Sequence, residues 1–171
     1  MARLRELNEA PDADVRAILL RACGSTRWVD RMMARRPFAN DARLLFAARN
    51  EWFGLTEADW LEAFAHHPRI GDRARAAAQS PEAHKWSSQE QSAAADASTD
   101  TLADLAEGNR AYEGRFGYVF LISATGRTSE EMLATLRERM RNEPETELTI
   151  ASGEQAKITR LRLMKLLEEL A

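Results

Sequence analysis

The sequence predicts an all-α protein, and three observations carry that prediction. Strand-forming residues are scarce, with only three valines and five isoleucines, whereas alanine, leucine, arginine and glutamate dominate. Apolar residues recur at helical spacing through most of the chain. Capping residues and glycines divide the chain into segments of helical length. We therefore expect a single compact domain over residues 1–171 with about eight to nine helices.

Helix-start and helix-stop residues place four helices in the first part of the chain. Their starts are Asp12 or Asp14, Ser25 or Thr26, Asn40 and Thr56, and their ends are Leu20 (stopped by Gly24), the residue before Pro37, Trp52 (stopped by Gly54) and the neighbourhood of His67. Aromatic and other large apolar side chains in these helices are spaced for buried faces. We interpret them as core residues rather than as a platform for a ligand.

The rest of the chain carries further helix signals. Two possible helix starts come first, at Ser80-Pro81 and at the S-x-x-E pattern of Ser87–Glu90. A helix is expected over 99–113, after which Gly114 and Gly117 interrupt the pattern, and a capping box at Thr128–Glu131 opens the next helix. The last helix is expected over about 145–170, and its apolar stripe consists of Ile158, Leu161, Met164, Leu167 and Leu170. Tyr118 to Ile122 is the one strongly apolar, β-prone run. Because no other candidate strand exists to pair with it, we interpret it as a buried segment entering or inside a helix.

Composition narrows the classes of partner. A net charge of −3 offers no general attraction for nucleic acid or anionic lipid, so we expect neither kind of partner, and local arginines must hold any anionic ligand. No apolar run approaches the ~20 residues that span a bilayer, and the first residues lack a signal peptide's apolar stretch, which predicts a cytoplasmic protein. The single cysteine, Cys23, is interpreted as a packed core thiol.

The segment His67-Pro68-Arg69-Ile70-Gly71-Asp72 sets an imidazole at a forced break in a helix. Proline disfavours helical geometry in the residue before it, so the preceding helix must end near His67. The partial negative charge of a helix C-terminus favours a protonated imidazole and would keep a proton donor available near neutral pH. His67 is therefore a candidate general acid. The alternative is a surface loop whose histidine caps a helix end.

Further motif blocks follow this hexapeptide along the chain. They are Trp86-Ser87-Ser88-Gln89-Glu90-Gln91, Tyr112-Glu113-Gly114-Arg115-Phe116-Gly117-Tyr118, Gly126-Arg127, and Glu154-Gln155-Ala156-Lys157-Ile158 leading to Leu161-Arg162-Leu163. In this order and spacing the blocks resemble the OHCU decarboxylase family, over nearly the whole chain. That family converts 2-oxo-4-hydroxy-4-carboxy-5-ureidoimidazoline (OHCU) to (S)-allantoin in uric acid breakdown.

The resemblance implies roles for individual residues. His67 would be the proton donor, Glu90 a catalytic partner that contacts or orients the substrate, and Gln91 a hydrogen-bonding neighbour. The remaining pocket residues would be Pro68 and Ser87, together with backbone groups of the segment that contains Phe120, Ile122 and Ala124. From the residues alone, Ser87 and Glu90 have an alternative role as a mutual helix cap.

The resemblance also aligns Arg162, rather than Arg160, with the family's substrate-contacting arginine. Arg162 comes four residues after Ile158, which puts it at the border of the expected apolar face. From there a planar guanidinium can grip a carboxylate or a ureido oxygen. Considered without the family, an arginine at such a position is a solvated helix residue.

Decarboxylation leaves an electron pair, and the ring imine of this substrate can accept it. We therefore expect no cofactor and no metal; a metal site from His66, His67, Asp72 and His84 is an alternative that lacks the usual ligand spacing. The sequence thus predicts a cofactor-independent decarboxylase acting on the small molecule OHCU, and the family suggests a homodimer. The alternatives are a catalytically silent helical interaction module, and an enzyme for another ureido or imidazoline acid.

Overall fold

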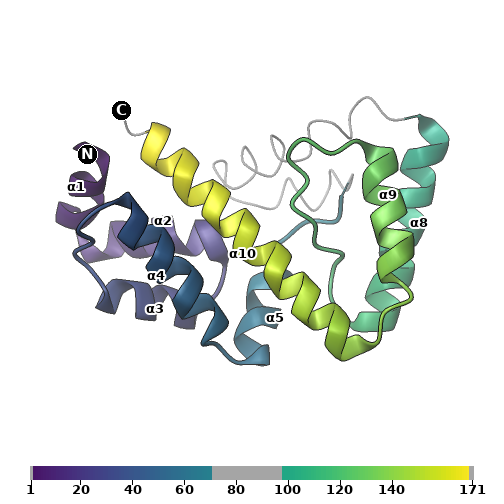
Figure 1. The fold of residues 1–171 in the computed structure, drawn as a ribbon, viewed down its shortest axis with the longest axis horizontal. Coiled ribbons are helices and arrows are strands. Elements are labelled where there is room, and N and C mark those ends of the chain that lie inside the picture. The colour runs from purple at the N-terminus through teal and green to yellow at the C-terminus, as the bar shows by residue number, and fades with distance from the viewer. Residues whose placement is uncertain (1, 71–97, 170–171) are drawn as a thin grey trace. The chain divides into compact units, whose positions relative to one another are not determined.

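The computed structural model describes residues 2–70 and 98–169 of the chain, and within these ranges it contains eight α-helices and no strand. The all-α prediction is confirmed (Figure 1). The helices are α1 (Ala2–Glu9), α2 (Asp12–Cys23), α3 (Thr26–Ala34), α4 (Asp41–Phe53), α5 (Glu57–Ala65), α8 (Thr99–Phe116), α9 (Ser129–Arg139) and α10 (Pro144–Glu169). None of these helices combines the length and the apolar character that crossing a membrane requires.

The chain divides into two compact units. Unit 1 comprises residues 1–63 and 155–171, and unit 2 comprises residues 64–154. Helix α10 contributes its first turns to unit 2 and its remaining turns to unit 1, and α5 contributes its last two residues to unit 2.

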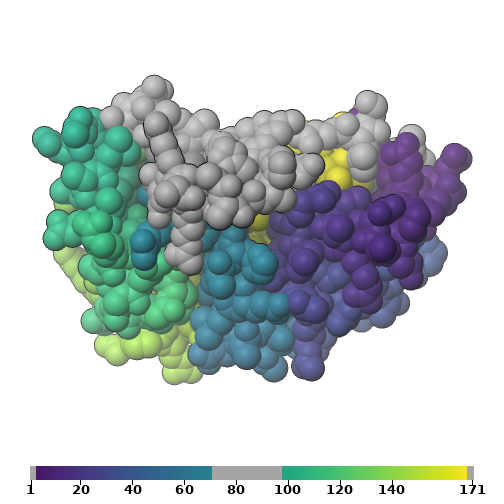
Figure 2. All heavy atoms as spheres, turned by 180° about the vertical axis from the view of Figure 1, so that it is seen from behind, coloured from purple at the N-terminus to yellow at the C-terminus, as the bar shows by residue number. Residues whose placement is uncertain are grey.

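Unit 1 is built around two tryptophans that are both buried and hydrogen-bonded. Trp28 on α3 donates from its indole to the backbone oxygen of Ala48 on α4, at 2.9 Å. Trp52 on α4 accepts at its backbone oxygen from the indole of Trp60, at 3.0 Å. The expected side-chain caps are present, since Ser25 accepts from the Trp28 backbone and Asn40 from the Arg43 backbone. Helices α2 and α3 pack directly on each other, and their spheres adjoin in Figure 2.

Two features at the start of unit 1 differ from the expectation. Helix α1 is not predicted by the sequence pattern, because only Leu4 and Leu7 mark its buried face. The Arg3 guanidinium fixes this helix by donating to the backbone oxygen of Leu167, at 2.6 Å. Helix α2 begins after Pro11 and has no side-chain cap, so neither Asp12 nor Asp14 caps it; both lie in its first turn.

In unit 2, α8 and α9 pack side by side. Gly108 permits this approach, since a Cβ built on it would lie 2.8 Å from Leu136 Cδ2. The capping box of Thr128 and Glu131 is present as predicted. Helix α8 is longer than expected: Gly114 lies inside it, and the helix ends only at Gly117, which has a φ of 82°.

The apolar run after α8 is buried but not helical, so that part of the expectation is wrong. Val119, Phe120, Leu121 and Ile122 are all buried, yet the segment has no regular structure and leads from the C-terminal end of α8 to the N-terminal end of α9 (Figure 1). The left-handed conformation of Gly117 stops the helix before the run begins. Side chains of α9 and α10, rather than a neighbouring strand, then bond its backbone.

The buried face of α10 is also rotated from the predicted stripe. Ile158 is buried as expected, whereas Leu161, Met164 and Leu167 are only partly buried and Leu170 lies outside the described residues. The buried positions also include Gln155, Thr159, Arg162, Leu163 and Leu166. A stripe drawn through apolar residues alone misplaces the face because polar side chains occupy part of it.

Candidate functional site

His67 lies in a tight turn directly after α5, as the proline predicts. The backbone N–H of His67 donates to the backbone oxygen of Phe64, at 3.1 Å, and α5 ends at Ala65. The His67 side chain is only 8% exposed, and Pro68 is buried. Its neighbour His66 is exposed. Of the two adjacent histidines, the turn therefore buries His67, for which a role as proton donor is predicted.

The same turn is tied to α8 by an ion pair between two of the motif blocks. The guanidinium of Arg69 donates to the Glu113 carboxylate, from Nε at 2.9 Å and from a second nitrogen. Ile70 packs into the same apolar cluster as Phe120, Ile122 and Ala124. A hollow of about 250 Å³ adjoins the turn in unit 2. Its lining residues are Arg69, Ile70, Leu102, Leu105, Ala106, Asn109 and Arg110.

The segment with Phe120, Ile122 and Ala124 is held by two charged side chains. Arg139 at the end of α9 donates to the backbone oxygen of Leu121 at 2.6 Å, and its guanidinium lies over the Phe120 ring, 4.7 Å from the centroid. Glu154 on α10 accepts from the backbone N–H of Ser123 at 2.7 Å. This backbone is therefore fixed at two points only two residues apart.

Arg139 is in turn held by Glu147, which is completely buried. Glu147 also accepts from the amide of Asn142, at 2.8 Å, and from the hydroxyl of Tyr112. Burial and the hydrogen bond to Glu147 raise the pKa of Tyr112 far above its ordinary value. Tyr112 therefore stays a neutral donor, and the carboxylate has a partner on each oxygen.

Arg162 lies in unit 1, in the middle of the buried face of α10 rather than at its border. It is 6% exposed, and its guanidinium donates to the backbone oxygen of Arg21 near the C-terminus of α2, at 3.3 Å. Arg160 is exposed.

Cys23, the last residue of α2, is buried as predicted. Burial raises the pKa of its thiol to about 12, even though contacts with Ser25, Thr159 and Arg162 lower this pKa.

The structure locates six of the nine predicted site residues. His67, Pro68, Phe120, Ile122 and Ala124 belong to unit 2, and Arg162 belongs to unit 1. Ser87, Glu90 and Gln91 lie outside the described residues, as do Asp72 and His84 of the alternative metal site. Within residues 2–70 and 98–169, no three histidine, cysteine or acidic side chains gather as a metal site would require.

The sequence pattern predicts no role for the two charged residues that hold the Phe120–Ala124 segment, Arg139 and Glu154, or for Glu147, which holds Arg139. Glu154 belongs to one of the motif blocks, which is its only signal. Arg139 continues the stripe of Met132 and Leu136 on α9, and a charged residue in such a stripe signals a buried polar contact. Glu147 gives no comparable signal, because its burial depends on its partners.

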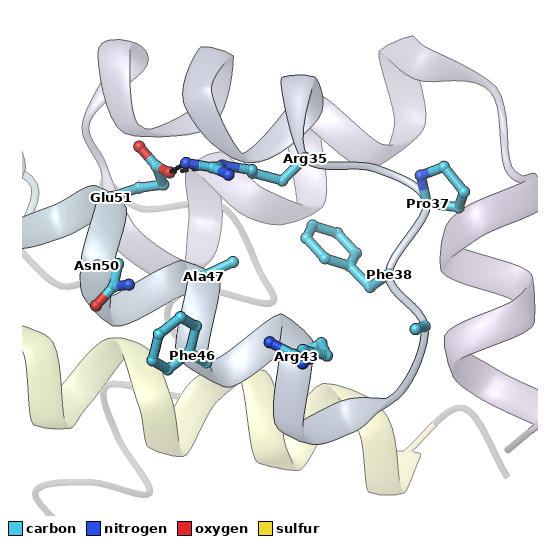
Figure 3. Close-up of a pocket in the computed structure, with 9 residues that line it drawn as sticks. Arg35, Pro37, Phe38, Arg43, Phe46, Ala47, Asn50 and Glu51 are labelled. Atoms are coloured by element: carbon cyan, nitrogen blue, oxygen red, sulfur yellow. Dashed lines mark hydrogen bonds and ion pairs between the residues drawn. The ribbon is translucent and has the colours of Figure 1, made fainter.

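A second hollow, of about 300 Å³, lies in unit 1 between α4 and the loop after α3 (Figure 3). Phe38 and Phe46 line it from the loop and from α4, and Arg35 pairs with Glu51 at its rim, at 2.7 Å. It contains none of the predicted site residues.

The arrangement of helices and motif blocks has known counterparts. The family model described as OHCU decarboxylase matches residues 8–164. The chain belongs to this family. The "Uric acid degradation bifunctional protein TTL" of Arabidopsis thaliana is 41% identical over 150 residues, which are 87% of this chain and 46% of that protein. The 2-oxo-4-hydroxy-4-carboxy-5-ureidoimidazoline decarboxylase of Amia calva is 42% identical over 60 residues, which are 35% of this chain and 34% of that protein.

A solved structure agrees with this membership of the OHCU decarboxylase family. The crystal structure of an OHCU decarboxylase in the presence of (S)-allantoin has a TM-score of 0.76 and 38% identity, and the match covers 93% of this chain and 99% of that one. The matched stretch covers less than half the length of each of the two curated relatives.

Proposed function

We propose that this protein decarboxylates OHCU to (S)-allantoin and CO2 in the breakdown of urate. The observation that carries the proposal is the 38% identity to an OHCU decarboxylase structure obtained with (S)-allantoin, over 99% of that chain. The family match over residues 8–164 supports it, because it contains every residue to which we give a role.

The chemistry needs little beyond a fixed acid and complementary hydrogen bonds. Loss of CO2 leaves an electron pair on the ring carbon, and the adjacent ring imine accepts it. The proposed reaction therefore requires neither a metal nor an organic cofactor. The protein must hold the departing carboxylate, stabilise the charge that develops, and deliver a proton to one face.

In this proposal the buried imidazole of His67 delivers that proton, and Glu90 contacts or orients the substrate. Arg162 grips a carboxylate or ureido oxygen with its planar fork. The other substrate contacts come from Pro68, Ser87, Gln91 and the backbone of Phe120, Ile122 and Ala124. The low exposure of His67 and Arg162 supports these roles, because hydrogen bonds to charged groups are stronger away from water.

The proposal extends to the setting of the reaction. Residues 1–171 form one catalytic domain, the protein acts in the cytoplasm on a small molecule, and neither nucleic acid nor a membrane is a partner. A homodimer is the proposed assembly. Sedimentation at several protein concentrations tests the assembly, and a monomer at every concentration would contradict it.

The chirality of the product tests the reaction itself. OHCU is unstable, so it is generated from urate by the enzymes that precede this step, and allantoin is followed by circular dichroism. Spontaneous decay gives a racemate, whereas the proposed enzyme gives an excess of the S form. The control is the same mixture with heat-unfolded protein. A racemic product in the presence of folded protein would refute the proposal.

A further inference from the structure

Glu154 lies in a motif block but has no role in the proposed reaction. It sits on α10 in unit 2, with 7% of its surface exposed, and its carboxylate accepts from the backbone N–H of Ser123 at 2.7 Å. The contact joins two segments 31 residues apart. It reaches the stretch of backbone to which we assign substrate contacts.

The geometry of this contact depends on the length of the Glu154 side chain. The bond from the Ser123 N–H is 2.7 Å long, and a neutral side-chain oxygen at the same reach can accept the same hydrogen bond. A side chain one methylene shorter reaches the N–H only if the backbone shifts. The position of the acceptor, rather than its charge, is therefore what the contact contributes.

The second contact with this backbone lies two residues away. Arg139 donates to the backbone oxygen of Leu121, so Leu121 and Ser123 are both bonded by protein side chains. Among the described residues, none makes a hydrogen bond to the backbone of Phe120 or Ile122.

We propose that Glu154 is a positioning residue that holds Ser123 so that the backbone groups of Phe120 and Ile122 are presented to the substrate. Arg139 assists from the oxygen of Leu121. Glu154 itself touches no substrate atom. This inference rests on the proposed function and adds to it the residue that sets the register of the binding backbone.

Two conservative variants separate geometry from charge. Glu154→Gln keeps the reach and an acceptor oxygen but removes the charge. Glu154→Asp keeps the charge but withdraws the carboxylate by one methylene. If position is what matters, Glu154→Asp raises KM about tenfold with kcat nearly unchanged, and Glu154→Gln leaves both within about threefold of the wild type. A purely electrostatic role predicts the reverse order and would overturn the inference.

Amide hydrogen exchange at Ser123, measured by NMR, reports the contact independently of activity. We expect Ser123 to be protected in the wild type and in Glu154→Gln, and to exchange faster in Glu154→Asp. Thermal unfolding of each variant shows whether the fold is kept. Faster exchange at Ser123 in a folded Glu154→Asp protein with an unchanged KM would make the contact merely structural and refute the inference.

The outcomes also separate this inference from the proposed function. A wild-type protein that gives racemic allantoin refutes both. A wild-type protein that gives S-allantoin, with equal KM values for all three forms, refutes only the role of Glu154. If Glu154→Asp does not fold, Glu154→Gln decides: a tenfold higher KM overturns the inference, and an unchanged KM with Ser123 still protected supports it.

Discussion

Arg139 and Glu147 form an ion pair that is closed to water on both sides. Their closest approach is 2.6 Å, with Arg139 5% exposed and Glu147 fully buried. Arg139 is the last residue of α9, and Glu147 lies in the first turn of α10. Because Arg139 also bonds Leu121 and covers Phe120, the pair connects the α9–α10 corner to the segment with the proposed substrate contacts.

Removing one partner of this pair should destabilise the protein strongly. Arg139→Met leaves the Glu147 carboxylate buried without its cation, and we expect a loss of about 3–5 kcal/mol in the free energy of unfolding, measured by urea denaturation. Arg137→Met is the matched control on the same helix. It breaks an exposed pair with Asp104, at 2.7 Å, and should lose only about 0–1 kcal/mol. Equal losses in the two variants would contradict the prediction.

Cys23 should make stability depend on pH in the alkaline range. Burial raises the pKa of its thiol from 9.0 to about 12 in the folded protein. Between these values the unfolded chain has lost the proton and the folded chain has kept it. The stability that the neutral thiol provides is therefore complete below pH 9 and falls as pH rises toward 12, by up to about 1.4 kcal/mol per unit.

The difference between the wild type and Cys23→Ala isolates this effect from other groups that titrate at high pH. The two unfolding free energies should run parallel below pH 9 and converge above it. A thiol reagent should also react with Cys23 only after unfolding, because the thiol is buried and protonated. Parallel curves up to pH 11 would contradict the assigned pKa.

Local signals were sufficient to predict most helix ends. Ser25, Asn40 and the Thr128–Glu131 box act through contacts within three residues, so the chain itself specifies them. The break at His67 is equally local, since Pro68 imposes it. The role proposed for Arg162 comes from the family resemblance alone, because an arginine in a helix gives no local sign of its role.

What the sequence did not predict depends on contacts between distant segments. The prediction that the Tyr118–Ile122 run enters or lies inside a helix rests on the lack of a partner strand. In the structure, side chains bond this backbone instead: Arg139 bonds Leu121, 18 residues before it, and Glu154 bonds Ser123, 31 residues before it. The face of α10 was misplaced for the same reason. Gln155 and Thr159 are buried because they bond each other, at 3.0 Å, which hydrophobic periodicity does not register.

His67 and His66 form a natural pair of test and control. His67→Asn removes the buried imidazole, and we expect kcat for OHCU to fall by roughly 10²-fold or more, the usual scale for a positioned acid. His66 is exposed, so His66→Asn should leave kcat within about twofold. Stopped-flow measurement with freshly generated substrate provides both values. A large loss in His66→Asn with a normal His67→Asn would reassign the proton donor.

Variants of Glu90 test whether the proposed proton donor, His67, acts alone. Glu90→Ala should lower kcat by a similar factor, and the double variant with His67→Asn should be little worse than the poorer single variant, because residues that act as one unit give non-additive losses. Glu90→Gln distinguishes catalysis from capping, since glutamine still fits a capping box. A fully active Glu90→Gln protein would mean that the charge is dispensable.

Arg162 should bind substrate through the shape of its guanidinium as well as its charge. Arg162→Lys keeps the charge but cannot make a planar two-pronged contact, and we expect kcat/KM to fall by an amount equivalent to about 2–4 kcal/mol. The exposed Arg160 provides the control, and Arg160→Lys should leave kcat/KM unchanged. Because Arg162 also bonds the backbone of Arg21, unfolding must be measured on the same samples. A lower unfolding midpoint with normal kcat/KM would make Arg162 a structural residue, and a defect confined to Arg160→Lys would move the substrate contact to Arg160.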